Sequence, residues 1–315
     1  MLHNMLAYGI ENIGYALGSH CIDNIQAAAS YSKSEDFIRD KIGFLTLRRM
    51  GQEQSLQSLC KDAFNDLTKK HSFRPESCEL LIVVTQNPDG GHALPHISAL
   101  LQNELGLSTN IAAFDIGLGC SGYVYALSIA CAFMQLNNIN NGLLFTADPY
   151  SSILNYNDAN TQLLFGDAAT CTLLSNSPKY KLGKSCFGTD GSRADSLCLL
   201  SNGILDMKGR DIFNFSLSTI PDIIKQCVEN NKLDKEDIDC LLLHHASKFI
   251  VDTIGQRLSL PNATVPFLLQ DIGNCVSSTI PIALSRLDSN FKNILISGFG
   301  VGLSWGASVL FHTEL

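Results

Sequence analysis

The sequence has few charged residues for its length. Only 17% of its 315 residues are Asp, Glu, Lys or Arg, while 45% are hydrophobic. This balance predicts a large, compact chain of one or two domains. Acidic residues outnumber basic ones, 30 to 22, which gives a formal net charge of −8 at pH 7. Nucleic acids and anionic membrane surfaces attract positive charge, so we expect neither as a partner.

The cysteines also lack the spacing patterns that indicate disulfide pairs or metal sites. There are 11 of them, an odd number, with no C-x-x-C pair and no metal-type spacing. Many lie in apolar runs, where cysteine acts as a small hydrophobic residue, as is typical of a reducing compartment. No Lys or Arg precedes Lys33, and no uninterrupted apolar run reaches membrane-spanning length. We therefore expect no metal, no signal peptide, no membrane span and a cytoplasmic location.

One stretch combines glycines and apolar residues around Cys120. An apolar run of strand length at 111–116 leads into the letters GLGCSG at 117–122, and 123–136 is apolar on nearly every side. The pattern predicts a strand, a tight glycine turn and a buried helix with Cys120 at its start. Unpaired N–H groups and partial positive charge at a helix start stabilise a thiolate, which makes Cys120 a candidate nucleophile. The alternative is a small cysteine buried at a tight corner.

Apolar periodicity predicts further elements on both sides of this stretch. The predicted helices cover residues 34–42 with Ser34 as the cap, then 55–69, 94–105, 217–228 and 279–287. The predicted strands cover residues 6–15, 80–85, 142–147, 165–175, 239–244 and 293–299. The polar segment 175–185, which contains proline and glycine, is the candidate linker.

The second half of the chain repeats the order of elements in the first. The letters DIG at 271–273 mirror DIG at 115–117, and the predicted helix at 279–287 mirrors the central one. Alternating helices and apolar strands indicate an α/β fold with buried sheets. We expect two pseudo-symmetric halves: 1–177, which carries the cysteine, and 178–315, which carries the residues described next. Packed face to face, the halves would place their central helices together in the core.

Two polar residues of the second half are candidates to join Cys120. His244 ends a predicted strand, and Asn274 lies in the turn before the second central helix, near the counterpart of Cys120. Taken singly, a structural histidine and a turn asparagine are the alternatives. Together they predict a nucleophile with an imidazole and an amide donor. His245 should face away, because neighbours in an extended segment point to opposite sides.

Four motifs together resemble the β-ketoacyl-acyl-carrier-protein synthase III family of the thiolase superfamily. They are GCSG at 119–122, HHAS at 244–247, Gly273-Asn274 and GFGVGLSWG at 298–306. The resemblance runs from about Leu6 to the C-terminus with the spacing kept. The combination is specific, although each motif alone would be weak.

The resemblance implies a thiolase-like five-layer αβαβα sandwich and a homodimer that pairs the strands preceding the central helices. Cys120 would take an acyl group from a thioester. His244 and Asn274 would bind the carbonyl of a malonyl thioester on acyl carrier protein and stabilise the enolate left by loss of CO2. The N–H groups of Cys120 and Gly302 would form the oxyanion hole when that enolate attacks acyl-Cys120. No metal or redox cofactor is implied, since the substrates carry phosphopantetheine from acyl carrier protein or coenzyme A.

The resemblance also implies a set of substrate-binding positions, some of which depart from the family. They are Phe37, Lys41, Leu94, Gly209, Phe213, Ala246 and Ser247. The family's adenine-stacking tryptophan falls on Phe37, a nearby arginine on Lys41 and a second arginine on Ser152. Its gate phenylalanine falls on Leu94, and its His-Gln-Ala-Asn motif reads His-His-Ala-Ser at 244–247. Coenzyme A should therefore be a weaker acyl donor than carrier protein.

The carrier-protein contacts change as well. The family's basic contacts fall on Asn214 and Phe249, which are uncharged, while Arg210 and Lys248 lie next to them and are candidates to substitute. Altered recognition beside an intact catalytic trio predicts a specialised relative.

Three functions are compatible with these residues. The first is decarboxylative condensation in fatty-acid or secondary-metabolite biosynthesis. The second moves the acyl group from Cys120 to an alcohol or amine without decarboxylation, and the third is a non-catalytic partner in a heterodimer. Relatives of the second kind are often altered at the asparagine, so the presence of Asn274 favours condensation. The intact cysteine, histidine and asparagine argue against the third.

Overall fold

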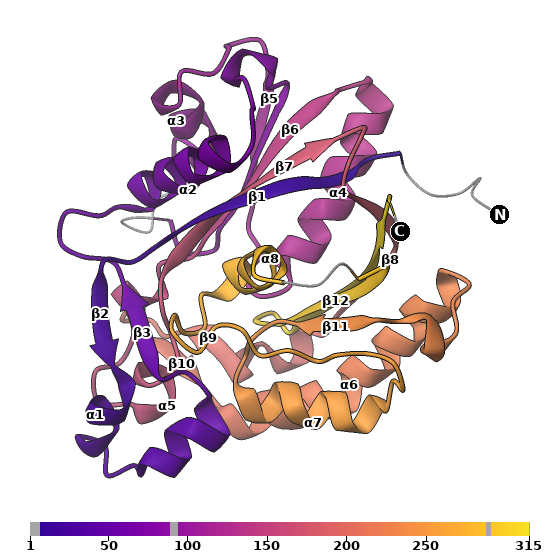
Figure 1. The fold of residues 1–315 in the computed structure, drawn as a ribbon. Helices are drawn as coiled ribbons and strands as arrows, with labels where there is room; N and C mark the ends of the chain where they lie inside the picture. Colours follow the sequence, from indigo (N-terminus) through magenta and orange to yellow (C-terminus); the bar gives the residue numbers. More distant parts are fainter. Residues whose placement is uncertain (1–6, 89–93, 288–290, 315) are drawn as a thin grey trace.

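The computed structural model describes residues 7–88, 94–287 and 291–314, and within them nine strands share one hydrogen-bonded sheet (Figure 1). The strand order is β11-β12-β13-β8-β1-β7-β6-β4-β5. The first half of the chain contributes β1 (Gly9–Leu17), β4 (Leu80–Val84), β5 (Ala112–Ile116), β6 (Asn141–Ala147) and β7 (Ala168–Ser175). The second contributes β8 (Tyr180–Thr189), β11 (Cys240–Leu243), β12 (Asn293–Gly300) and β13 (Ser304–His312).

The two halves of this sheet have the same internal order. From the junction of β1 with β8, one half runs β1-β7-β6-β4-β5 and the other runs β8-β13-β12-β11. A parallel bridge from Cys240 to Thr264 lies where the counterpart of β5 belongs. At the junction, Gly9 pairs with Lys181 and Ile10 with Tyr180. The repeat read from the sequence is therefore a structural repeat, and the predicted boundary between the halves falls in the turn from β7 to β8.

Helices form three layers around the two half-sheets (Figure 1). The central helices α4 (Gly122–Asn137) and α8 (Thr279–Ser285) each contact strands of both halves. On the outside, α2 (Leu56–Lys70) and α3 (Ile97–Glu104) cover one half-sheet. The opposite half-sheet contacts α6 (Gly209–Asn230), which packs in turn against α7 (Lys248–Leu258). These layers confirm the five-layer thiolase-like α/β sandwich.

The remaining elements lie near one corner of the molecule, around the end of the central layer (Figure 1). Apart from short 3-10 turns, they are β2 (His20–Asp23), α1 (Asn24–Ala29), the π-helical segment η1 (Phe37–Ile42), β3 (Thr46–Arg49), α5 (Ala159–Gln162), β9 (Leu197–Leu199) and β10 (Leu205–Met207). The hydroxyl of Ser34 accepts a hydrogen bond from the Phe37 N–H at 3.1 Å, as expected for its predicted capping role. Within the described residues, no helix is both long and apolar enough to cross a membrane.

One prediction about the strands is wrong, and a second is right except for its boundary. The predicted linker is mostly strand β8, in which Tyr180 and Leu182 are buried, Lys181 is half-buried and Lys184 is exposed. Its polar residues therefore belong to a partly exposed strand of the sheet. The predicted first strand starts later, at Gly9, and Leu6 lies outside the described residues.

The central helix α4 is also less enclosed than its composition predicts. Ile129 is 41% exposed and Leu136 is 81% exposed, although the rest of the helix packs between the half-sheets. Both lie on a face of α4 that the chain's own sheets leave uncovered. Near it, Phe133 of α4 contacts Phe114 of the edge strand β5, with ring centroids 5.7 Å apart. An apolar helix face thus reaches the surface beside a sheet edge.

Close contact between α2 and β1 depends on Gly14. The helix buries one apolar face, which begins after the capping residue Ser55. A Cβ atom added at Gly14 would lie 2.3 Å from the Leu67 nitrogen and 2.4 Å from the Ala63 carbonyl oxygen. Because both atoms are backbone, a side chain here would push the helix off the sheet.

We therefore expect Gly14→Ala to lower the free energy of unfolding by about 1–3 kcal/mol through overpacking. Gly191→Ala is the matched control, because a Cβ atom there meets no atom within 4 Å. The control should change stability by less than about 0.5 kcal/mol. Urea denaturation of both variants measures the difference, and equal midpoints would contradict this packing.

Candidate active site

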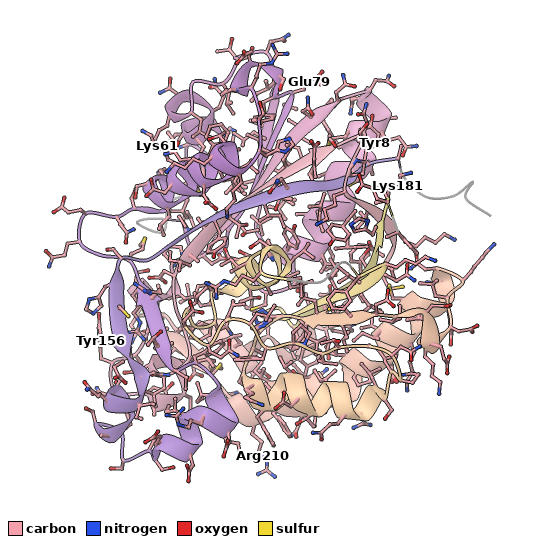
Figure 2. All side chains as sticks on the ribbon, viewed as in Figure 1. Tyr8, Lys61, Glu79, Tyr156, Lys181 and Arg210 are labelled. Carbon is pink, nitrogen blue, oxygen red and sulfur yellow. The ribbon has the colours of Figure 1, made fainter. Side chains whose placement is uncertain are left out.

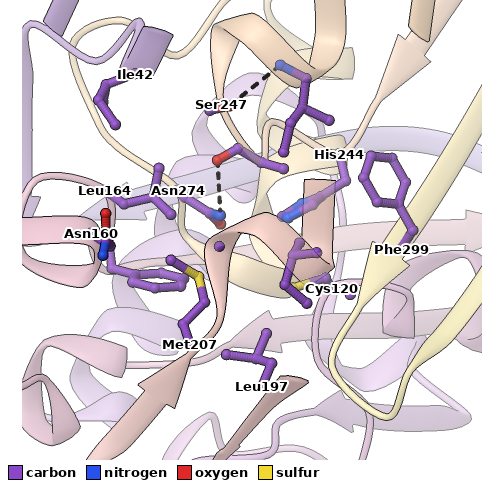
Figure 3. Close-up of a pocket in the computed structure, with 16 residues that line it drawn as sticks. Ile42, Cys120, Asn160, Leu164, Leu197, Met207, His244, Ser247, Asn274 and Phe299 are labelled. Carbon is purple, nitrogen blue, oxygen red and sulfur yellow. Dashed lines mark hydrogen bonds between the residues drawn. The ribbon is translucent and has the colours of Figure 1, made fainter. Parts of the chain in front are cut away.

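A cavity of about 150 Å³ brings the three predicted catalytic residues together (Figure 3). Cys120, His244 and Asn274 line its inner part and are 5%, 1% and 3% exposed. Asn160 and Gly209 are exposed and mark its mouth. The other walls are mainly apolar and include Ile42, Leu164, Phe165, Leu197, Met207, Ile212, Ile250 and Phe299. The site is a mainly apolar pocket with a few polar groups at its base.

Cys120 is held in the turn between β5 and α4, just before Ser121, the N-cap of α4. The turn packs directly on β12. A Cβ atom added at Gly300 would lie 2.8 Å from the Cys120 sulfur, so only glycine permits this approach. The Ser121 and Ser304 hydroxyls hydrogen-bond at 2.6 Å and fasten the same turn to β13.

The protonation state of Cys120 differs from the sequence prediction. Burial, and secondarily the negative charge of Asp148, raise the pKa of the thiol to about 12. Backbone N–H groups of Val301 and of Cys120 itself lower it, but by less. The predicted stabilisation of the thiolate by the helix start is therefore outweighed by desolvation. Cys120 therefore rests as a thiol. The role of the Gly302 N–H in the oxyanion hole stays a prediction.

His244 follows β11, and its backbone N–H donates to the Ser297 carbonyl at 2.8 Å. Its Nδ1 lies 2.7 Å from the Thr279 hydroxyl at the start of α8. The ring also packs edge-on against Phe299, with centroids 5.7 Å apart. Burial, and then the neighbouring His245, lower the pKa of His244 to about 3. The imidazole is therefore neutral at physiological pH.

Asn274 is fixed by both its backbone and its side chain. Its backbone N–H donates to the Leu164 carbonyl at 2.9 Å, which ties the second half's turn to the first half. Its side-chain oxygen accepts from the Val276 N–H at 2.9 Å. The side-chain nitrogen lies 3.5 Å from the Ala246 carbonyl, a long contact that Figure 3 marks with a dashed line. The side-chain oxygen is thus occupied by a backbone donor, and the nitrogen of this cavity-lining residue is the group left to donate.

His245 faces away from the cavity, as predicted. Its Nδ1 lies 2.9 Å from the Leu243 carbonyl oxygen, and its Nε2 accepts from the Leu268 N–H at 2.9 Å. The ring stacks on Phe267. This histidine is part of the structural support of the segment that carries its neighbour.

The predicted substrate-binding residues fall into two groups. Gly209, Ala246 and Ser247 line the cavity. Ser247 also caps α7, because its hydroxyl accepts from the Ile250 N–H at 3.4 Å. Leu94 does not line this cavity in the described chain and is 92% exposed.

The other predicted residues lie beside the mouth. The ring of Phe213 stacks on Phe249 at 5.3 Å, and the Lys41 ammonium lies 3.6 Å from the centre of the Phe249 ring. We call Lys41, Phe213 and Phe249 the entrance cluster. Phe37 is half-buried nearby on η1, with the Lys33 ammonium 5.2 Å from its ring centre.

Two polar residues at this site were not among those predicted from the sequence. Thr279 contacts His244, and Asp148 acts on Cys120 through its charge. Asp148 directly follows the strand at 141–147, so an acidic residue ending a buried strand was the available signal. The apolar lining residues gave no such signal, because they resemble any other core residue. Among the residues that the structure describes, no three His, Cys, Asp or Glu side chains gather closely enough to hold a metal ion.

The arrangement supplies a sulfur nucleophile and neutral hydrogen-bond donors around one apolar space. A sulfur atom can accept an acyl group and later release it. Donors aimed at a carbonyl oxygen stabilise the negative charge that develops there, and more strongly in a dry site. The chemistry that fits is acyl transfer through a covalent intermediate.

Comparison with known proteins agrees with this geometry. Residues 114–191 match the model of the 3-oxoacyl-[acyl-carrier-protein] synthase III family, and residues 228–311 match the model of its C-terminal part. A β-ketoacyl-[acyl-carrier-protein] synthase III of Streptococcus agalactiae is 31% identical, over 96% of this chain and 98% of the relative. One from Clostridium perfringens is 30% identical, over 95% of this chain and 98% of the relative.

Solved structures give the same result for the fold. A 3-oxoacyl-(acyl-carrier protein) synthase from Burkholderia xenovorans superimposes with a TM-score of 0.89 at 28% identity, covering 99% of this chain and 95% of that one. A synthase III from Aquifex aeolicus gives 0.87 at 25% identity, covering 97% and 100%. With family models, full-length relatives and structures in agreement, the chain belongs to the β-ketoacyl-acyl-carrier-protein synthase III family of acyltransferases.

Proposed function

We propose that this protein condenses a Cys120-bound acyl group with a malonyl thioester on acyl carrier protein, with loss of CO2. The observation that carries the proposal is the convergence of Cys120, His244 and Asn274 on one apolar cavity in a chain of this family. The acyl and malonyl groups enter on phosphopantetheine, and no other cofactor takes part.

The first step is thioester exchange at Cys120. The sulfur attacks the acyl thioester, its S–H proton passes to the departing phosphopantetheine thiolate, and the acyl group stays on the enzyme. Because the resting thiol has a raised pKa, the proton must leave as the new bond forms. The Cys120 and Gly302 N–H groups then face the acyl oxygen as its oxyanion hole.

The second step is decarboxylation at His244 and Asn274. Both side chains are neutral at pH 7, so they act as hydrogen-bond donors to the malonyl thioester oxygen. The C–CO2 bond breaks, CO2 leaves and the bonding electrons form the enolate. The enolate carbon attacks the acyl carbon of acyl-Cys120, the acyl C–S bond breaks to release the β-ketoacyl product, and the Cys120 sulfur takes a proton from solvent to become a thiol again. Donation from the His244 Nε2–H requires Nδ1 to accept a hydrogen bond from the Thr279 hydroxyl, and their 2.7 Å separation suits that bond better than the 3.2 Å from the same hydroxyl to the Val276 carbonyl.

Transfer to an alcohol or amine without decarboxylation is not favoured. It would leave the oriented Asn274 amide without a role, whereas decarboxylation uses it. A non-catalytic heterodimer partner is disfavoured too, since it has no need of an accessible cavity with an intact trio at its base.

We expect Cys120→Ala to abolish covalent acylation, because the nucleophile is removed while alanine keeps the packing volume nearly unchanged. Cys131→Ala is the matched control, since Cys131 is a buried cysteine of α4, the helix that follows Cys120. The measurement is intact mass after incubation with a panel of acyl thioesters. Acyl mass on the Cys120→Ala protein at the wild-type rate would show that another cysteine reacts.

We expect Asn274→Ala to acylate Cys120 normally but to lose condensation by about 100-fold or more, the usual cost of removing one oxyanion donor. Acylation of Cys120 in the same variant is the internal control for folding. Release of CO2 from malonyl thioester is the measurement, and a wild-type rate would remove Asn274 from the decarboxylation site.

We further propose a homodimer formed through β5. The strand is the sheet's edge within the described residues and its side chains are only partly buried. Exposed Ile129 and Leu136 belong to α4, whose Phe133 contacts Phe114 of β5, and exposed Leu94 comes just before α3, which packs against β5. A second copy would pair the edge and cover the exposed helix face.

We expect the protein to sediment as a dimer at micromolar concentration and Ile129→Glu to shift it toward monomer. Leu200→Glu, at a half-exposed position between β9 and β10, should leave the dimer intact. A wild-type monomer at this concentration would contradict the proposal.

Carrier protein is the proposed acyl donor. In the family a tryptophan and an arginine stack on adenine, whereas here Phe37 has Lys33 near its ring and Ser152 bonds Pro149 and Asn87. The entrance cluster places one ammonium at the mouth, and Figure 2 shows Arg210 projecting outward from the start of α6. These cations suit an acidic carrier protein. The cysteine pattern, mostly buried among apolar side chains, supports a cytoplasmic location.

We expect kcat/KM for Cys120 acylation to be about tenfold or more higher with carrier protein than with coenzyme A carrying the same acyl chain. The lost adenine stacking is worth roughly 1–3 kcal/mol, at about 1.4 kcal/mol per decade. Phe37→Trp should raise kcat/KM with acyl-coenzyme A and leave kcat/KM with the acyl carrier protein unchanged. A clear preference of the wild type for coenzyme A would overturn this assignment.

A further inference from the structure

Asp148 is a buried carboxyl group for which the proposed reaction has no use. It directly follows β6 and is 0% exposed. Its Oδ1 accepts from the Gln86 N–H at 2.7 Å, and the Thr85 hydroxyl lies 3.5 Å from the same oxygen. Its Oδ2 accepts from the Ser277 hydroxyl at 2.5 Å. Burying a carboxyl group completely costs free energy of folding, so its presence here needs a functional or structural explanation.

These bonds connect the two turns that carry the reacting groups. The side chain of Gln86 reaches the Cys120 turn, because its Nε2 lies 3.4 Å from the Gly117 carbonyl oxygen. Ser277 belongs to the helical turn Val276–Ser278, which comes shortly after Asn274. One carboxyl group therefore lies between the nucleophile's turn in the first half and the amide's turn in the second.

The charge of Asp148 is not neutralised nearby. Within the described part of the chain, its hydrogen-bond partners are hydroxyl and amide groups, and none is a cation. Burial raises the pKa of Asp148 to about 6. The titratable groups that interact with it are the Cys120 thiol and the Tyr150 hydroxyl, and its charge raises the pKa of both. His244, which lines the same cavity as Cys120, is neutral.

We propose that Asp148 is a positioning residue that holds the Cys120 and Asn274 turns together. Its buried negative charge also disfavours a second negative charge on Cys120, in addition to the larger effect of burial. The proposal rests on the proposed function for the meaning of those turns. Its electrostatic part is a property of the resting protein and is testable without turnover.

The variant Asp148→Asn separates charge from shape, because an amide keeps an acceptor for Gln86 and a partner for Ser277. Without the negative neighbour, the pKa of Cys120 falls and more thiolate is present at any given pH below it. We expect alkylation of Cys120 by iodoacetamide at pH 8, followed by peptide mass, to be about 3- to 10-fold faster than in wild type.

Asp167→Asn is the matched control. Asp167 is a second buried carboxyl group held by a serine hydroxyl, Ser151, and by backbone N–H groups of Met50 and Ser151. It interacts with Arg49 and is not among the groups that shift Cys120. Its variant should alkylate at the wild-type rate. If Asp148→Asn also alkylates at the wild-type rate or more slowly, the electrostatic role is wrong.

Two further measurements test the proposal if the Asp148→Asn variant does not fold. In wild type, the logarithm of the alkylation rate should rise with pH and flatten near pH 6, where Asp148 ionises; a straight line through pH 6 overturns the charge effect. Ser277→Ala keeps the charge and breaks the bond to the second turn. It should leave alkylation unchanged and slow CO2 release, and an unaltered rate of CO2 release overturns the positioning role. Loss of acylation in wild type would instead overturn the proposed function, leaving the alkylation result intact.

Discussion

Contact between the Cys120 turn and β12 is the constraint on which the site depends. The nucleophile comes from the first half of the chain and the surface beneath it from the second, so neither half contains the site alone. Gly300 permits the approach, because a side chain there would collide with the Cys120 sulfur. The hydrogen bond from the Asn274 backbone to Leu164 fixes the opposite wall across the same boundary. The catalytic geometry is thus a consequence of how the two half-sheets pack, and the paired layers around α4 and α8 are what hold it.

This packing also decides the charges of the site. Deep burial disfavours every ionised form, so Cys120 remains a thiol and His244 remains neutral. A permanent thiolate–imidazolium pair is therefore not the resting state. A neutral site suits a reaction whose negative charge appears only in passing, first on the acyl oxygen and then on the enolate. Donors that are already oriented stabilise that charge without having to reorganise.

Much of this could be predicted from the sequence because the relevant signals are local. Glycines around Cys120, apolar strand runs and the mirrored Asp-Ile-Gly letters indicated the repeat, the layers and the trio. Other features depend on distant packing. The polar residues of β8 were interpreted as a linker because alternation on a half-exposed strand looks like a polar segment. The pKa of Cys120 was misjudged because a helix start is visible in the sequence, whereas burial and the charge of Asp148 are visible only in three dimensions. Leu94 was assigned by resemblance, and a single chain leaves it at the surface.

Different kinds of interaction dominate in the interior and at the entrance of the cavity. Inside, interactions are short, neutral and shielded from salt, and they determine which bonds form and break. At the mouth, Lys41 and Arg210 are exposed and act through charges that ionic strength screens. Such charges set the encounter rate and the choice of partner more than the chemical step. Substitutions in the entrance cluster and at Phe37 alone can therefore change which acyl donor is preferred. The reaction catalysed by the buried Cys120, His244 and Asn274 stays the same. Phe249 illustrates the point, because as an aromatic ring it carries no charge of its own yet places the ammonium of Lys41 beside the mouth.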